Sequence, residues 1–201
     1  MQKKVAIINY GLGNVSSVSN ALFSIGVDNV ITYDTSEIRN ATHIILPGVG
    51  SFAKGMQNLQ TSLLLSVIKE ETKKGKPLLG ICLGMQMLYQ KGYENGETQG
   101  LSFIKGEIQP FTNIPYKVPH VGWNQVEILK QNKLLQDIED LNFYFVHSYY
   151  AISKDAAIGK TEYGIKFVSA VEKENVFGVQ FHPEKSGNSG LRLLKNYCEV
   201  V

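Results

Sequence analysis

Residues 77–89 read PLLGICLGMQMLY. The apolar run at 78–81 predicts a buried strand, because it is short and is bounded by a proline and a glycine-rich turn. The residues that follow predict a helix with Met85, Leu88 and Tyr89 on one face. The strand therefore passes into a helix through a very tight turn, which is the context of a nucleophile elbow.

The turn carries a cysteine, Cys82, where many hydrolases carry serine. Gly80 and Gly84 flank it and remove the Cβ atoms that would clash if Cys82 adopts a strained backbone conformation. The partial positive charge at the N-terminus of the following helix favours the thiolate form of Cys82 over the thiol. The alternative is a buried cysteine that acts only as a small hydrophobic residue. Partners elsewhere in the chain decide between the two.

The first half of the chain alternates strands and helices. Apolar runs predict strands at 4–9, 29–33, 43–46 and 78–81, and amphipathic patterns predict helices at 14–25 and around 63–68. This alternation indicates a doubly wound, mostly parallel α/β sheet of the flavodoxin-like kind. After residue 92, strand-like runs at 101–108, 122–129, 142–146, 167–171 and 176–181 predict additional antiparallel strands, and 189–197 predict a final helix. We expect a single domain over 1–201.

The composition excludes several classes of function. A net charge of +2 and 19% charged residues argue against a nucleic-acid footprint. No spanning apolar run or leader segment is visible, and the two cysteines, Cys82 and Cys198, suit a reducing compartment, so we expect a cytoplasmic enzyme. The four histidines lack metal-ligand spacing. Gly11-x-Gly13 resembles a dinucleotide turn, but Ser16 replaces the third glycine, so we expect no cofactor.

The second half supplies partners for Cys82. His182-Pro-Glu184 follows the predicted strand at 176–181, and proline holds His182 in the extended region. Glu184, two residues on in an extended chain, can then orient the imidazole ring. The order cysteine, histidine, glutamate meets the roles of a catalytic triad. The loop at 47–50 follows a neighbouring strand, and its backbone N–H groups, with that of Leu83, can form an oxyanion hole.

Several motifs together resemble the class I (triad) glutamine amidotransferases. Within that family they are most similar to the glutaminase subunits of imidazole glycerol phosphate synthase. The motifs are NYGLGN (9–14), PGVGSF (47–52), GICLGMQ (80–86), PHVGWN (119–124), FVHSY (145–149) and QFHPEKS (180–186). The resemblance extends from residue 9 nearly to the C-terminus. It implies hydrolysis of L-glutamine to glutamate and ammonia, and a (β/α)8-barrel cyclase as partner.

The resemblance also implies roles for individual residues. The catalytic set is Cys82, His182 and Glu184, with Val49 and Leu83 at the oxyanion hole. It implies substrate contacts at Gly50, Gln86, Glu94, Ser148 and Tyr149, and partner contacts at Asn14, His120, Trp123, Asn124 and Lys185. We interpret His147 as a hydrogen-bonded core histidine.

Two other interpretations remain open. The chain can be the glutaminase subunit of another pathway, such as anthranilate, guanylate or pyridoxal phosphate synthesis, although the motif at 119–124 disfavours this. It can also be a non-enzymatic relative that keeps the cysteine elbow. Glu184 and Gln86 speak against that second alternative, because a protein without catalysis has no need of an orienting carboxylate or a substrate-binding amide.

Overall fold

The computed structural model describes residues 3–153 and 156–200. Its N-terminal part contains β1 (Lys4–Ile8), α1 (Val15–Ser24), β2 (Asp28–Thr32), α2 (Thr35–Asn40), β3 (His43–Gly48), α3 (Phe52–Thr61), α4 (Leu64–Lys73), β4 (Leu78–Cys82) and α5 (Leu83–Met87). The alternation of strands and helices agrees with the one that the apolar pattern predicts, except that α2 was not predicted. The expected helix around 63–68 is the second of two helices, because α3 precedes it and ends at Thr61.

The rest of the described chain is mostly strand. It contains β5 (Tyr89–Gly92), β6 (Thr98–Gln99), β7 (Ile104–Pro110), β8 (His120–Gln125), β9 (Glu127–Ile128), β10 (Asn142–His147), β11 (Tyr149–Ile152), β12 (Ala157–Tyr163), β13 (Ile165–Lys173), β14 (Val176–Val179), the 3-10 turn η1 (Pro183–Lys185) and α6 (Gly187–Glu199). The predicted run at 122–129 is two strands, β8 and β9, which belong to different sheets.

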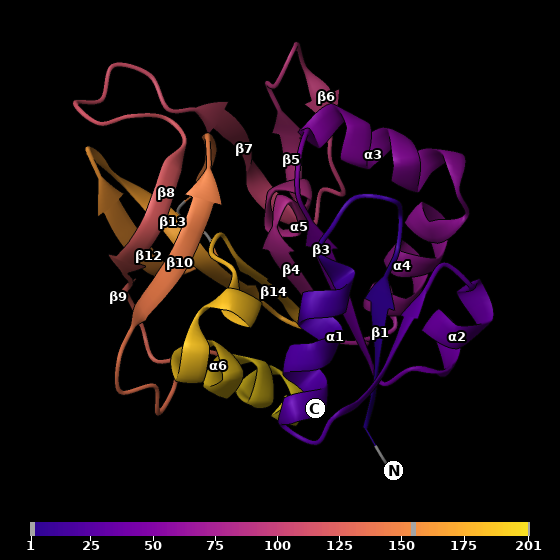
Figure 1. Ribbon diagram of the computed structural model, residues 1–201. Helices are drawn as coiled ribbons and strands as arrows, with labels where there is room; N and C mark the ends of the chain where they lie inside the picture. Colours follow the sequence, from indigo (N-terminus) through magenta and orange to yellow (C-terminus); the bar gives the residue numbers. More distant parts are fainter. Residues whose placement is uncertain (1–2, 154–155, 201) are drawn as a thin grey trace.

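The central sheet is mixed, as expected. Strands β2, β1, β3, β4 and β14 are parallel neighbours in that order, and β13 joins β14 in the antiparallel sense. The sheet continues through β11, β7, β5 and β6, while β8 and β10 pair separately (Figure 1). The carboxyl ends of β3, β4 and β14 therefore meet at one edge, which is where open α/β sheets bind ligands.

Both faces of the parallel sheet are covered. Val5 and Ile7 of β1 face one core, which includes apolar residues of α1 and α6. Ala6 and Ile8 face the other, which includes residues of α2, α3 and α4. Figure 1 shows these helices on opposite sides of the strands. Burial on both faces explains why the parallel strands are continuous apolar runs rather than alternating ones.

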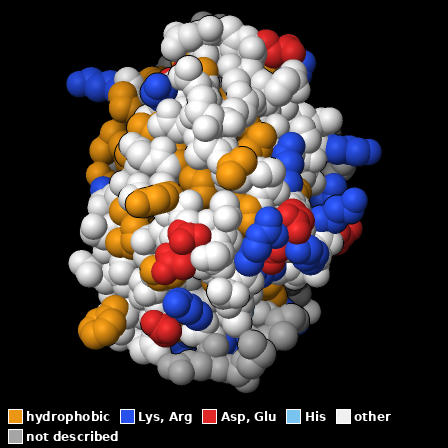
Figure 2. Space-filling model, turned by 90° about the vertical axis from the view of Figure 1, so that its right-hand side faces the viewer, with side chains coloured by type: hydrophobic (Ala, Val, Ile, Leu, Met, Phe, Trp, Pro, Cys, Tyr) orange, Lys and Arg blue, Asp and Glu red, His pale blue; other side chains and the backbone are white. Residues whose placement is uncertain are grey.

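The face with α2, α3 and α4 carries charges of both signs. Glu70 forms ion pairs with Arg39 and Lys74. Glu71 forms ion pairs with Lys74 and Lys76. Basic and acidic side chains accordingly lie next to one another in Figure 2 rather than forming a field of one sign. Within the described residues, none of the helices combines the length and the apolar character needed to cross a membrane.

The helix after the elbow is shorter than predicted. The pattern placed Leu88 and Tyr89 on its apolar face, but α5 ends at Met87. Tyr89 begins β5 and pairs with Ile104 of β7. All three apolar residues of the expected face are still buried, because the strand β5 lies in the same core. Periodicity alone cannot distinguish one turn of helix followed by a buried strand from a longer helix.

Candidate active site

The elbow at Cys82 is strained in the way that its glycines predict. Cys82 ends β4 with φ of 54° and ψ of −108°, a conformation that is rare for a residue with a side chain. A Cβ on Gly80 would lie 2.6 Å from the Met85 amide nitrogen. One on Gly84 would overlap the Leu46 carbonyl oxygen of β3. Glycine at both places is therefore required for α5 to begin so close to the strand.

His182 and Glu184 form a buried pair beyond the end of β14. The His182 Nδ1 atom lies 2.8 Å from Glu184 Oε1, and both side chains are almost completely inaccessible. His182 is extended, with φ of −103° and ψ of 94°, as the following proline predicts. The expectation that Glu184 reaches the ring along an extended chain was wrong. Pro183–Lys185 form a 3-10 turn, which folds the carboxylate back under the imidazole.

The surroundings of His182 favour its charged form. Burial lowers the pKa of the ring, but Cys82 and the Glu184 carboxylate outweigh burial and raise it to about 10. His182 Nε2 has no hydrogen-bond partner among the residues that the structure describes. Since Nδ1 is held by Glu184, Nε2 is the nitrogen left to exchange a proton with the thiol.

A cavity of about 420 Å³ opens above Cys82. It is lined by the residues predicted for the oxyanion hole and for substrate contacts, together with a few neighbours: Val49, Gly50, Ser51, Cys82, Leu83, Gln86, Glu94, Pro119, Val146, His147, Ser148 and Tyr149. These residues come from five separate stretches of sequence. The fold thus gathers around Cys82 the residues that were predicted for the oxyanion hole and for substrate contacts, whereas His182 and Glu184 are not among the lining residues.

The predicted oxyanion donors lie on neighbouring strands. Gly48 pairs with Cys82 in the parallel register of β3 and β4. The next residue of each segment, Val49 and Leu83, therefore follows at the same edge of the sheet, and both line the cavity. Gly50 has φ of 97°, a conformation that favours glycine.

Glu94 and Gln86 are fixed by neighbours at the cavity wall. Glu94 Oε2 accepts a hydrogen bond of 2.7 Å from the backbone amide of Phe52, at the start of α3. Gln86 Nε2 donates to the Tyr149 carbonyl at 3.1 Å and to Gln180 Oε1 at 3.1 Å. The Gln86 carbonyl and one Glu94 oxygen remain as acceptors for a cationic group.

Gln180 is a site residue that belongs to a motif quoted above but received no predicted role. Its side chain is fully buried, and its Nε2 lies 3.7 Å from Cys82 Sγ. The Val146 carbonyl oxygen is also 3.7 Å from the sulfur. A glutamine near the end of an otherwise apolar buried strand was the available signal, because a buried amide needs specific partners.

The residues predicted at a partner interface are divided between surface and interior. Asn14 is exposed at the start of α1, and Lys185 is exposed with its ammonium 5.9 Å from the centre of the Tyr144 ring. Trp123 is 55% exposed. His120, by contrast, is buried, and Asn124 donates inward to it, so neither side chain presents a free group on this surface.

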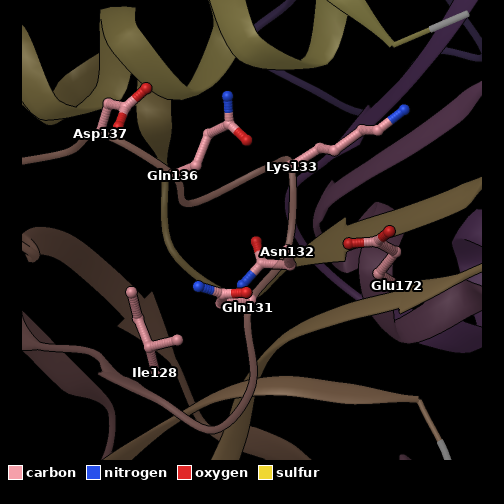
Figure 3. Close-up of a pocket in the computed structure, with 7 residues that line it drawn as sticks. All are labelled: Ile128, Gln131, Asn132, Lys133, Gln136, Asp137 and Glu172. Carbon is pink, nitrogen blue, oxygen red and sulfur yellow. The ribbon is translucent and has the colours of Figure 1, made fainter.

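A larger cavity, of about 660 Å³, lies elsewhere and carries none of the predicted site residues. Figure 3 shows its lining of Ile128, Gln131, Asn132, Lys133, Gln136, Asp137 and Glu172. It contains no thiol and no imidazole, so its lining cannot supply the cysteine–histidine pair that the sequence predicts. Chemical content rather than size identifies the smaller cavity as the candidate site.

Comparisons with known proteins agree with this geometry. The family model for glutamine amidotransferase class-I matches residues 6–200. A Campylobacter jejuni protein named imidazole glycerol phosphate synthase subunit HisH 1 is 45% identical over 200 residues, covering 98% of this chain and 100% of that protein. The HisH subunit of Bacillus mycoides is 48% identical over 199 residues, covering 98% and 95%.

Solved structures share the fold at much lower identity. A crystal structure of a glutamine amidotransferase matches with a TM-score of 0.77 at 15% identity, covering 97% of both chains. The PurLQS structure from Thermotoga maritima matches with a TM-score of 0.75 at 18% identity, covering 98% of both chains. The chain therefore belongs to the class I glutamine amidotransferase family, in the branch of the imidazole glycerol phosphate synthase HisH subunits.

Proposed function

We propose that this chain is the glutaminase subunit of an imidazole glycerol phosphate synthase. It hydrolyses the side-chain amide of L-glutamine and supplies ammonia to a cyclase partner in histidine biosynthesis. The observation that carries the proposal is the strained cysteine at the end of β4, in one cavity with the predicted oxyanion donors and beside a buried His182–Glu184 pair. The free thiols of Cys82 and Cys198 suit a reducing compartment such as the cytoplasm.

The first half-reaction forms a thioester. Cys82 transfers its proton to His182 Nε2, and the sulfur attacks the amide carbon of glutamine. The resulting oxyanion accepts hydrogen bonds from the N–H groups of Val49 and Leu83. When the carbon–nitrogen bond breaks, His182 returns the proton to the nitrogen, which leaves as ammonia.

The second half-reaction consumes water. His182 removes a proton from a water molecule, whose oxygen attacks the thioester carbon. The carbon–sulfur bond breaks, the Cys82 thiol is restored and glutamate leaves. Throughout, Glu184 holds Nδ1 of the imidazole and stabilises its charged form, as the orienting residue of a triad does.

Substrate orientation follows from the charges on the cavity wall. The free oxygen of Glu94 and the Gln86 carbonyl are acceptors for the α-ammonium group of glutamine. Backbone N–H groups near Gly50, Ser148 and Tyr149 are donors for its α-carboxylate. We propose that a glutamine held in this way presents its side-chain amide to Cys82.

Ammonia that escaped into water at neutral pH would be protonated and would lose its nucleophilicity, so it must pass directly to a second site. The proposed acceptor is a (β/α)8-barrel cyclase, which forms imidazole glycerol phosphate and an aminoimidazole carboxamide ribotide. The exposed residues Asn14, Trp123 and Lys185 are the proposed contacts with that barrel. A glutaminase subunit for anthranilate, guanylate or pyridoxal phosphate synthesis remains the alternative, and co-purification of a different synthase would favour it.

The test is reconstitution. The chain is mixed with the cyclase subunit and the nucleotide substrate, and glutamate release and cyclase product are measured together. We expect glutamine to support product formation with about one glutamate released per product. Absence of glutamine hydrolysis with the cyclase present would overturn the proposal, and the non-enzymatic alternative would then stand.

A further inference from the structure

A continuous series of hydrogen bonds runs through the interior between β8 and the cavity. Asn124 Nδ2 lies 3.3 Å from His120 Nε2, and His120 Nδ1 lies 3.0 Å from His147 Nε2. His147 Nδ1 lies 2.8 Å from the Tyr149 carbonyl oxygen. The series joins residues from β8, β10 and β11, so it links elements that are distant in sequence.

The two ends of the series fix the tautomer of each ring. The Tyr149 carbonyl can only accept, so His147 Nδ1 carries a proton and its Nε2 is an acceptor. His120 Nδ1 must then donate to His147, which leaves His120 Nε2 to accept from the Asn124 amide. Asn124 uses its two hydrogens on His120 and on the Glu162 carbonyl, and its oxygen accepts from the Gln125 amide. Every donor meets one acceptor.

The rings are held neutral and immobile by their surroundings. Both are buried, and burial lowers the pKa of His120 to about 4 and that of His147 to about 3. His120 stacks on Tyr163 with ring centroids 3.9 Å apart and on Phe145 at 4.9 Å. A neutral imidazole donates a hydrogen bond from one ring nitrogen and accepts one at the other, so each ring passes on a fixed direction of hydrogen bonding.

The series ends on the Tyr149 carbonyl oxygen, which also belongs to the hydrogen bonds that lead to Cys82. The Tyr149 carbonyl also accepts from Gln86 Nε2, whose second hydrogen goes to Gln180 Oε1. Gln180 Nε2 in turn lies 3.7 Å from Cys82 Sγ. The Tyr149 carbonyl is therefore connected, through Gln86 and Gln180, to the amide that faces the sulfur.

The other end of the series lies at a surface rich in apolar groups. On β8 the exposed side chains Val121 and Trp123 alternate with the inward residues His120 and Asn124. Tyr116 and Val118, just before the strand, are 56% and 43% exposed. Under the proposed function, this is the surface that a partner subunit covers.

We propose that His120 and His147 are positioning residues that couple the Asn124 end of β8 to the Tyr149 carbonyl, and through Gln86 and Gln180 to the Cys82 sulfur. Neither ring contacts the reacting atoms in this role. The coupling rests on the proposed function for its kinetic consequence, but the directional hydrogen bonding is a property of the chain alone.

The first test is nitrogen-15 NMR of the chain with labelled histidine at pH 8. We expect both rings to be protonated at Nδ1 and unprotonated at Nε2. Asn124→Ala should shift the resonance of His120 Nε2, which loses its donor, while His120 Nδ1 stays protonated because His147 Nε2 still accepts from it. The proposal is overturned if either ring is mainly protonated at Nε2 in the wild-type chain, or if Asn124→Ala leaves the His120 spectrum unchanged. This experiment needs no partner subunit, so it tests the series of hydrogen bonds even if the proposed function is wrong.

The second test is kinetic and uses the reconstituted complex. His120→Phe keeps the stacking on Tyr163 but removes both ring nitrogens. The substitution removes two hydrogen bonds, those to Asn124 and His147. If the free energy of about one hydrogen bond is lost at the site, kcat/KM for glutamine falls about three- to tenfold, with ammonium-dependent synthesis unchanged. Gln125→Ala, an exposed neighbour on β8 that does not touch His120, is the matched control.

A purely structural role gives a different pattern. In that case His120→Phe lowers the melting temperature but leaves kcat/KM of the folded complex equal to that of Gln125→Ala, and the proposal is overturned. If His120→Phe does not fold, Asn124→Ala removes the same series at its surface end and carries the same expectation.

Discussion

Gly84→Ala is expected to damage both stability and catalysis, because a Cβ at this position has no space. It would overlap the Leu46 carbonyl oxygen and lie 2.8 Å from the carbonyl carbon, whereas ordinary van der Waals contact begins at 3.4 Å. The neighbour is the backbone of β3, a central strand of the sheet, so it cannot rotate away. The start of α5 must move instead, and Leu83 moves with it.

The expected magnitude follows from that displacement. Overpacking a well-filled interior costs about 1–3 kcal/mol, and we expect the upper end, about 3 kcal/mol, because backbone is displaced. For a chain of this size that lowers the melting temperature by about 6–12 °C. A misplacement of about 1 Å at the oxyanion donor lowers the glutaminase rate by about 100-fold.

The assay pairs thermal unfolding with glutamine hydrolysis in the reconstituted complex. Gly26→Ala is the control: Gly26 also lies next to a helix end and has φ of 76°, but a Cβ added there would have no atoms within 4 Å. It should cost about 1–2 kcal/mol through backbone strain alone and leave the rate unchanged. The account of the elbow is refuted if Gly84→Ala matches Gly26→Ala in both melting temperature and rate.

Three further predictions concern the site and its surroundings. Glu184→Gln should lower the glutaminase rate by roughly four orders of magnitude at most, and by less than His182→Ala does, because it removes orientation and charge but not the base; an unchanged rate would contradict the triad. Trp123→Ala should weaken cyclase binding by about 2 kcal/mol or more while the melting temperature of the isolated chain stays constant, and the reverse pattern would place Trp123 in a structural role. The free energy of unfolding should fall as pH drops below about 6.5, by up to about 1.4 kcal/mol per pH unit for each of His120 and His147. The reason is that both rings are neutral in the folded chain and take up protons in the unfolded chain. A flat profile of the free energy of unfolding between about pH 7 and pH 5 would contradict their buried neutral state.

The parallel half of the fold could be predicted because its signals are local. Continuous apolar runs and helical stripes alternate there, and Gly80 and Gly84 mark a close approach that any elbow requires. The carboxyl ends of the strands then fix where a ligand binds, whichever helices surround them. For this reason the place of Cys82 and of the loop at 47–50 followed from sequence.

The second half could be predicted only in outline. Whether 122–129 is one strand or two depends on which strands pair with it, and β8 and β9 belong to different sheets. The 3-10 turn at Pro183–Lys185 likewise depends on Ser186. The Ser186 hydroxyl donates a hydrogen bond to the His182 carbonyl and accepts one from the Tyr144 backbone amide. The contact with Tyr144 joins residues 42 positions apart, and local pattern carries no information on it.

The polar interior was the least predictable part of the site. His147 is the hydrogen-bonded core histidine that was expected. Gln180 and His120 are ordinary in sequence, since a buried amide or imidazole differs from an exposed one only in its partners. The interior position of His120 and the inward bond of Asn124 follow from the pairing of β8 with β10, which brings His120 opposite His147.

The most direct measurement of the central claim compares two nitrogen sources in the Cys82→Ala complex. If the Cys82 thiol is the nucleophile, glutamine-dependent synthesis and glutamate release are abolished, while synthesis from added ammonium salts continues at the wild-type rate. Hydrolysis of glutamine by the Cys82→Ala complex at a near wild-type rate would contradict the account.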